Sequence, residues 1–160
     1  MRREPSFPTT PSVMRTFLLA ALFAALALPA QAQFAVGGQL GDPTGLSLKA
    51  GAGPGALLLA IGWDLDGFDQ VSAEGHYVLS QRRVQGADAN LGLFYGPGLF
   101  LRASDGPGDG DVDFGLSLGI GLEAALTQDI EAYGLVSPRI QLIEETDFGV
   151  GGGVGLRLRL

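Results

Sequence analysis

The stretch FGVGGGVGLRLRL, residues 148–160, decides the fold class of this chain. Apolar residues from Phe148 to Leu160 stand at every second position, with Gly152 as the one gap, and glycine or arginine fills the positions between them. A repeat of two places successive side chains on opposite faces of a β-strand. The stretch therefore predicts a strand with one apolar face and one small or charged face.

Residues 1–32 have the features of a secretory signal peptide. Arginines precede an unbroken apolar run, Phe17–Leu28, and Ala30 and Ala32 frame an A-x-A cleavage site. The run is too short for a helix that spans a membrane. We therefore expect cleavage after Ala32, which leaves residues 33–160 as the mature domain.

The rest of the chain repeats the alternation in eight segments. Turn-forming glycine, proline and aspartate residues separate these segments, and helical periodicity is absent after the leader. An even number of strands with hairpin-length links predicts an all-β fold, an eight-stranded antiparallel up-and-down transmembrane β-barrel. The expected strands are 33–41, 45–50, 56–65, 70–80, 90–102, 112–126, 130–143 and 148–160.

Two prolines fall inside expected strands. Pro97 and Pro138 each lack the N–H group that a β-ladder uses. A closed barrel accepts such a residue only at a bulge or at a rim. We therefore expect each proline to lie at a bulge or at a rim.

The two faces of the expected strands differ in charge. One face carries apolar and aromatic side chains without a charged residue, and we expect it to face lipid. The other face alternates charged residues with glycine and serine, and we expect it to line a lumen. Charges in a narrow lumen must pair, because a buried unpaired ion costs several kcal/mol, and glycine leaves room inside a barrel of eight strands. The expected lumen charge network consists of Lys49, Asp64, Glu74, His76, Arg102, Asp113, Glu123, Glu131, Arg139, Arg157 and Arg159.

Aromatic residues stand near the ends of the expected strands. Trp63, Phe114 and Phe148 belong to one rim of the barrel, and Phe34 and Tyr77 to the other. Outer-membrane barrels carry a girdle of aromatic side chains at each membrane interface. These residues therefore favour two such girdles, and aromatic residues scattered at random through a core are the alternative.

Composition restricts the function classes. The chain has a net charge of −7, and some of its ten basic residues lie in the leader, so the mature part is more acidic still. Nucleic acid is therefore not an expected partner. The absence of cysteine excludes disulfides, thiolate metal sites and a lipid anchor on cysteine. Mean hydropathy is +0.27, which is high for a secreted soluble domain and which alternating strands in lipid would explain.

Three segments carry a resemblance to a known family. They are Gly38–Lys49, which reads GQLGDPTGLSLK; Phe94–Gly98, which reads FYGPG; and the closing Gly-x-Gly-x-Arg of residues 153–157. The mature chain resembles a family of uncharacterised bacterial outer-membrane barrel proteins. The resemblance implies outer-membrane lipid as its surroundings and the barrel-assembly machinery as its partner during biogenesis, and it carries over no catalytic residue. Leu160 departs from the terminal phenylalanine that is usual in such barrels, which puts recognition by the assembly machinery in doubt.

The sequence leaves three functional classes open. The main expectation is a barrel of the bacterial outer membrane with a lumen filled by side chains and a structural or surface-binding role. Its loop 104–111 is the candidate contact for a surface partner. A soluble lipocalin-like barrel would instead turn the apolar face inward around an apolar ligand. A lipid-modifying enzyme would use His76 with Ser80, near Glu74.

Two further motifs match known signatures without supporting a site. Gly115–Gly119 fits G-x-S-x-G, but that motif requires a turn from strand to helix, and these residues lie within an expected strand. The acidic segments 64–69 and 105–113 resemble calcium loops but lack a glutamate placed for bidentate binding. We therefore expect no catalytic residue, no metal site and no cofactor.

Overall fold

The chain divides into two compact units, Met1–Ala32 and Gln33–Leu160. The first unit, which holds the expected signal peptide and its cleavage residues Ala30 and Ala32, lies outside the described residues. The structure, a computed structural model, describes residues 34–63, 70–83, 91–104, 111–143 and 146–160.

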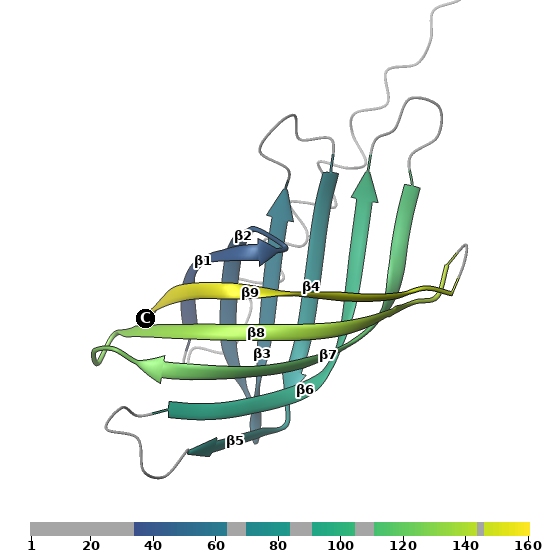
Figure 1. Ribbon diagram of the computed structural model, residues 1–160. Coiled ribbons are helices and arrows are strands. Elements are labelled where there is room, and N and C mark those ends of the chain that lie inside the picture. Colours follow the sequence, from purple (N-terminus) through teal and green to yellow (C-terminus); the bar gives the residue numbers. More distant parts are fainter. Residues whose placement is uncertain (1–33, 64–69, 84–90, 105–110, 144–145) are drawn as a thin grey trace, which may run out of the picture. The chain divides into compact units, whose positions relative to one another are not determined.

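Every element among the described residues is a β-strand. The strands are β1 (Phe34–Asp42), β2 (Gly45–Ala52), β3 (Gly55–Trp63), β4 (Gln70–Val78), β5 (Ser80–Arg83), β6 (Leu91–Ser104), β7 (Asp111–Ala125), β8 (Ile130–Gln141) and β9 (Phe148–Arg159) (Figure 1). Neighbouring strands pair antiparallel, and β4 and β5 both pair with β6. β4 and β5 therefore act as one interrupted strand of the barrel wall. We call each such wall strand a stave, and the barrel has eight staves.

The first and last strands close the sheet. β1 pairs with β9 from Ala35↔Arg159 onward, and the N–H of Leu160 donates to the carbonyl of Phe34 (2.8 Å). In Figure 1, β8 and β9 consequently cross in front of β3 and β4. The expected all-β fold, a closed antiparallel barrel of eight staves, is confirmed.

Most strands begin and end within two residues of their expected positions. The fourth expected strand, 70–80, differs in that it is divided and extended. β4 ends at Val78, and β5 continues from Ser80 into the segment 81–89 that the sequence assigns to a loop. The physical reason lies on the neighbouring stave, at Pro97.

Pro97 lies opposite a bulge. The N–H of Leu79 donates to the carbonyl of Tyr95 (3.1 Å), so the backbone polar groups of Tyr95 face the stave of β4 and β5. Pro97, two residues later, faces the same stave and has no N–H to donate. Between the β4 and β5 ladders, that stave has one residue more than β6. Of the two sites that the sequence allows for this proline, a bulge or a rim, the structure has the bulge.

The expectation of a bulge or a rim is wrong for Pro138, which lies within β8 at a gap in the β7–β8 ladder. The N–H of Leu142 donates to the carbonyl of Phe114 on β7 (2.9 Å), which places the nitrogen of Pro138, four residues earlier, on the same side. Pro138 cannot donate to Leu118, which lies opposite it. Pairing is interrupted at Leu118 and Gly119 and continues on both sides of them.

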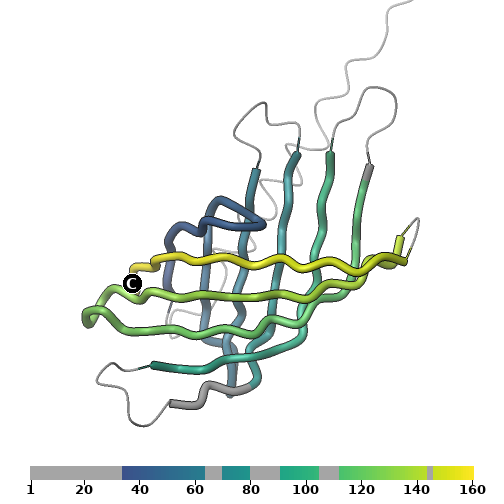
Figure 2. Tube along the Cα trace, in the orientation of Figure 1, coloured from purple at the N-terminus to yellow at the C-terminus, as the bar shows by residue number. Residues whose placement is uncertain are grey.

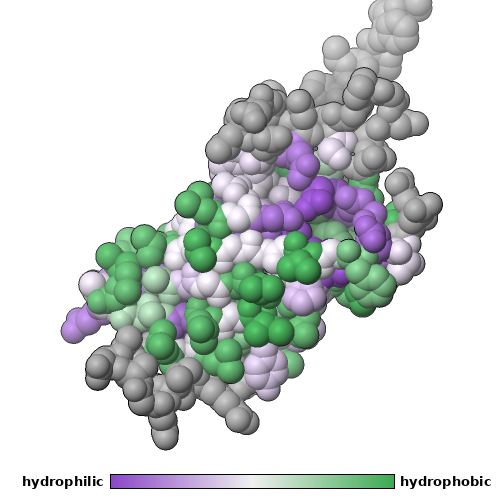
Figure 3. All heavy atoms as spheres, in the orientation of Figure 1, coloured by the Kyte–Doolittle hydropathy of each residue, from purple (hydrophilic) through white to green (hydrophobic). Residues whose placement is uncertain are grey.

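The two faces of the barrel wall differ in chemistry. Large apolar side chains face outward on every stave, and Figure 3 shows hydrophobic side chains covering the strands on one side of the barrel. The buried polar and charged residues, including Glu74, Glu131 and Arg157, face inward. Among the strand residues whose side chains are described, none on the outer face is charged. The assignment of apolar and charged residues to opposite faces therefore matches the structure.

Candidate functional site

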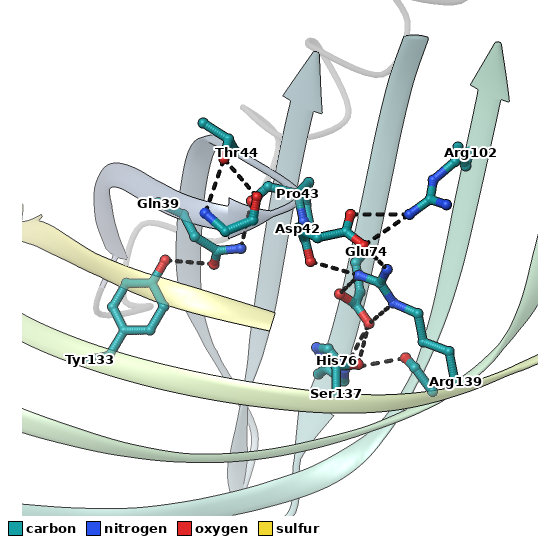
Figure 4. A network of polar contacts seen from close by, with 12 residues as sticks. Gln39, Asp42, Pro43, Thr44, Glu74, His76, Arg102, Tyr133, Ser137 and Arg139 are labelled. Carbon is teal, nitrogen blue, oxygen red and sulfur yellow. Dashed lines mark hydrogen bonds and ion pairs between the residues drawn. The ribbon is translucent and has the colours of Figure 1, made fainter. Parts of the chain in front are cut away.

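The first group of inward side chains, the Glu74 network, centres on an arginine. The guanidinium of Arg139 lies 2.7 Å from the carboxylate of Asp42 and 2.6 Å from that of Glu74 (Figure 4). Arg102 lies 2.9 Å from Asp42. The cationic group of Arg139 also lies 5.4 Å from the centre of the Phe100 ring. Two cations and two anions from β1, β4, β6 and β8 thus neutralise one another inside the barrel.

Hydroxyl groups extend the Glu74 network toward β7. Ser137 donates a hydrogen bond to the carboxylate of Glu74. Nε2 of His76 lies 3.2 Å from Oγ of Ser117 and 3.4 Å from Oγ of Ser137. The same nitrogen lies 3.5 Å from the carboxylate of Glu74. All four side chains are buried, so the cluster joins β4, β7 and β8 away from solvent.

This geometry differs from that of a nucleophilic triad. A triad places its hydroxyl at one ring nitrogen of histidine and its carboxylate at the other. Here Ser117, Ser137 and Glu74 all approach Nε2 of His76. The side chain of Ser80, the partner that the sequence suggests for His76, lies outside the described residues. Among the described side chains, these contacts connect β4, β7 and β8.

A second group, the Glu131 network, centres on a buried carboxylate. Glu131 is 1% exposed and lies 3.4 Å from Lys49, 3.4 Å from Arg157 and 3.0 Å from Arg159. Lys49 also lies 2.6 Å from Glu123. The ion pairs connect β2, β7, β8 and β9 across the lumen.

Neutral polar groups complete the Glu131 network. The hydroxyl of Tyr133 donates to the side chain of Gln39 (2.8 Å) and lies 2.6 Å from Oγ of Ser47. The guanidinium of Arg157 lies over the ring of Tyr133, 3.6 Å from its centre, and donates to Ser47 (2.9 Å). The amide of Gln39 donates to the carbonyl of Pro43 (2.8 Å). Each buried polar group of this set therefore has a partner, which removes the cost of placing it inside the barrel.

Along β8, an apolar layer lies between the charged groups of the two networks; the ring of Tyr133 belongs to this layer, while its hydroxyl belongs to the Glu131 network. On β8, Ser137 belongs to the Glu74 network and Glu131 to the other. The inward residues between them are Leu135 and Tyr133. Packed apolar side chains thus interrupt the polar lining, as is typical of a small barrel that side chains fill. The layer consists of Leu58, Val78, Phe94, Tyr133 and Leu135.

Inward glycines leave the space that the lumen side chains occupy. A Cβ atom at Gly151 would lie 2.0 Å from the guanidinium carbon of Arg139. A Cβ atom at Gly119 would lie 2.7 Å from the ring of His76. Gly149, two residues before Gly151 on the same face, would meet nothing within 4 Å. The glycines at 119 and 151 are therefore complementary to the Glu74 network.

Gly151→Ala should lower the free energy of unfolding by about 1–3 kcal/mol. The new methyl group would push the guanidinium of Arg139 away from its carboxylate partners. Gly149→Ala is the matched control, since it adds the same methyl group to the same face of β9 in open space, and it should change stability by less than about 0.5 kcal/mol. Urea unfolding of both variants measures the difference, and equal effects would contradict this account of the inward glycines.

Most of the expected lumen charges lie in the two networks. Asp113 differs: within the described part of the chain it accepts a hydrogen bond from the amide of Gln141 (2.6 Å) instead of pairing with a cation. Asp64 lies outside the described residues. Arg159 lies at the rim and is partly exposed. The residues that the structure brings together are Lys49, Glu123, Glu131, Arg157 and Arg159 in one network, and Glu74, His76, Arg102 and Arg139 in the other.

Sequence reasoning missed several polar members of the lumen. It assigns Asp42 to a turn, whereas the carboxylate joins the Glu74 network. The backbone at Gly41 has a φ of 147°, a conformation that favours glycine, and the strict alternation of β1 ends there. Gln39, Ser47 and Tyr133 do follow the alternation, and their polar groups on the inner face were the available signal.

The structure places the five aromatic residues near the ends of strands. Trp63 ends β3, Phe148 begins β9, and Phe114 lies near the start of β7. These strand ends share one rim of the barrel. Phe34 begins β1 at the opposite rim, whereas Tyr77 lies near the end of β4, where β5 continues the same stave, and pairs with Leu57 near the start of β3. The placement is compatible with two girdles, and the girdles themselves stay a prediction.

The described residues hold no group of three or more histidine, cysteine, aspartate or glutamate side chains suited to a metal ion. Nor do the described ranges include a helix long and apolar enough to cross a membrane. No protein family, curated protein or solved structure matches the chain. The resemblance to uncharacterised outer-membrane barrels therefore stays a prediction, and function must be inferred from the geometry of the barrel.

Proposed function

We propose that this chain is an integral β-barrel of the bacterial outer membrane, exported by the signal peptide of residues 1–32, with a structural or surface-binding role. The observation that carries the proposal is the distribution of side chains, with apolar residues on the outer wall and paired charges in the lumen. Water favours the opposite distribution, because burying apolar surface stabilises a soluble fold and burying ions destabilises it.

The outer wall presents unbroken rows of apolar side chains. One row crosses four neighbouring staves, through the register pairs Leu99↔Leu116, Leu116↔Ile140 and Ile140↔Phe148. All four side chains are exposed. Soluble monomers rarely expose a contiguous apolar patch larger than a few hundred Å², whereas hydrocarbon tails match such a surface. The row supports an outer wall immersed in lipid.

The filled lumen supports a structural or surface role over a porin role. A general porin keeps a continuous aqueous channel, which requires many more strands than eight. Here the Glu74 network, the apolar layer and the Glu131 network follow one another along β8. The barrel therefore offers its surfaces, rather than its interior, for interaction.

The proposed partners follow from the same arrangement. Lipid would cover the outer wall, and the alternating β9, which Leu160 follows, would be the segment presented to the barrel-assembly machinery. The loop 104–111 joins β6 to β7 and is the candidate contact for a surface partner. Of this loop, residues 105–110 lie outside the described residues.

Two other functions make different demands on the lumen. A lipocalin-like carrier needs apolar side chains around an internal ligand, whereas the inward apolar residues here pack together between two charged networks. A lipid-modifying enzyme needs an activated nucleophile, and the described partners of His76 do not provide that geometry. Both comparisons favour the proposed membrane role.

Membrane extraction tests the proposal. We expect the mature protein to remain in the membrane pellet after alkaline carbonate treatment and to require detergent for release. We also expect its unheated form to migrate differently from its heated form on a denaturing gel, because a closed barrel resists unfolding by the detergent. A soluble periplasmic protein from the same cells is the control. Recovery of the chain as a soluble monomer would contradict the proposal and favour the lipocalin-like carrier.

A further inference from the structure

The β6–β7 hairpin is bordered on both edges by interrupted ladders. Within the hairpin, pairing is continuous along both strands, and Figure 2 shows the two strands side by side along their length. Pro97 on β6 pairs with Leu118 on β7, and Leu118 in turn lies opposite Pro138 on β8. The bulge at one edge and the gap at the other therefore lie at the same level of the wall.

The middle of the hairpin has few inward side chains with which to hold it in place. Phe94 packs in the apolar layer, and Phe100 lies beneath Arg139. Between these two rings, β6 and β7 present glycine to the lumen at every inward position except one. The inward residues at this level are Gly96, Gly98, Ser117 and Gly119.

Ion pairs tie both ends of the hairpin to other staves. Near one end, Arg102 of β6 lies 2.9 Å from Asp42 of β1. Near the other end, Glu123 of β7 lies 2.6 Å from Lys49 of β2. The ends are thus held by charge pairs, while the middle has incomplete ladders on both edges.

His76 lies on the lumen side of the middle of the hairpin. It belongs to β4, on one flank, and its Nε2 atom lies 3.2 Å from Ser117 within the hairpin and 3.4 Å from Ser137 on the other flank. The imidazole ring fits against β6 and β7 because both strands carry glycine where they contact it. A Cβ atom at Gly98 would lie 2.4 Å from the ring, and one at Gly119 would lie 2.7 Å from it. One imidazole nitrogen thus contacts both strands that border the β7–β8 gap.

We infer that the middle of the β6–β7 hairpin, which we call the strap, can separate from β4 and β5 on one side and from β8 on the other. The contacts of His76 with Ser117 and Ser137 keep the strap in the wall, and we call His76 the clasp. Two prolines remove backbone donors from the two edges of the strap, and the hydrogen bond between Ser117 and His76 takes their place. Parting of the middle would leave the ends anchored and would open the wall beside the Glu74 network. The inference concerns the wall itself and does not depend on the proposed function.

Hydrogen exchange followed by mass spectrometry tests the clasp on the folded mature protein. His76→Ala should speed exchange of the backbone amides of residues 117–121 roughly tenfold, the effect of losing one to two hydrogen bonds. Amides in the β1–β9 ladder should keep their exchange rates. Ser117→Ala removes only the hydroxyl on the strap, leaves the ring in place, and should act in the same direction if His76→Ala does not fold.

A repair variant separates a clasp from general destabilisation. Pro138→Ala supplies an N–H that faces the carbonyl of Leu118, so in the His76→Ala background it should return strap exchange most of the way to that of the parent protein. Tyr133→Phe is the matched control, since it removes hydrogen bonds to Gln39 and Ser47 in the other network. It should leave the strap unchanged.

Three outcomes would overturn the inference. The first is unchanged exchange of residues 117–121 in both His76→Ala and Ser117→Ala. The second is faster exchange spread evenly over the whole barrel, which would make His76 an ordinary packing residue. The third is failure of Pro138→Ala to slow exchange of the strap in the His76→Ala background.

Discussion

Glu131→Ala should lower the free energy of unfolding by about 3–5 kcal/mol, because removing one partner of a buried ion pair leaves the other uncompensated. Glu131 is 1% exposed and lies within 3.4 Å of Lys49 and Arg157 and 3.0 Å of Arg159. Its loss would leave three cations without their shared carboxylate. Unfolding by urea, followed through the fluorescence of Trp63, measures the change, since the chain has one tryptophan.

Two further variants make this result interpretable. Glu131→Gln keeps the size of the side chain and removes its charge, so it should retain most of the loss if charge pairing is the cause. Asp129→Ala removes an exposed carboxylate two residues away in the β7–β8 turn, and it should shift stability by no more than about 0.5 kcal/mol. Small and similar effects at both positions would mean that Glu131 faces water, contrary to the lumen described here.

Leu118→Arg should impair folding into lipid vesicles far more than Leu101→Arg. The two leucines are 44% and 45% exposed, so they are matched in burial and differ in their place along the wall. Leu118 lies at the middle of β7, whereas Leu101 lies near the end of β6. An arginine on the lipid face costs about 2–4 kcal/mol at the middle of the bilayer and about 0–1 kcal/mol near its interfaces.

Folding yield and urea titration in vesicles measure this gradient directly. A barrel surrounded by water gives no reason for it, because both side chains would then be equally exposed to solvent. Equal effects of the two arginines would therefore count against a lipid-facing outer wall. The same comparison in a thinner bilayer provides a further check. Position 101 should then lie farther from the hydrocarbon core, so Leu101→Arg should impair folding even less.

A period of two was sufficient to predict the fold because each strand has one face of each kind. The same alternation identified the inward face that carries Lys49, Glu131 and Arg139. It could not identify their partners. Lys49 and Glu131 are separated by 82 residues in sequence, and only the register and closure of the staves bring them together. The place of Asp42 in the Glu74 network was not predicted for a local reason. The backbone at Gly41 ends the alternation from which the inward residues were predicted.

The apolar layer of the lumen could not be read from the sequence. Leu58 lies inward between two outward leucines, Leu57 and Leu59, and a continuous apolar run carries no signal of which residue faces which side. Leu135 has the same ambiguity, because its neighbour Val136, which faces outward, is also apolar. The burial of these residues follows from the radius of the barrel and from the glycines opposite them, and neither quantity is visible in a single strand.

The pairing of β1 with β9 also has a consequence for how the chain folds. β1 can pair with β9 only after β9 has formed, and these two strands lie at opposite ends of the unit Gln33–Leu160. Joining such distant segments costs conformational entropy before any ladder bond compensates for it, so closure is expected to be slow. Until then two strand edges carry unpaired N–H and C=O groups, which are templates for aggregation. We therefore expect the chain to be most prone to aggregation between its synthesis and the closure of the barrel. This period ends when residues 148–160 pair with β1.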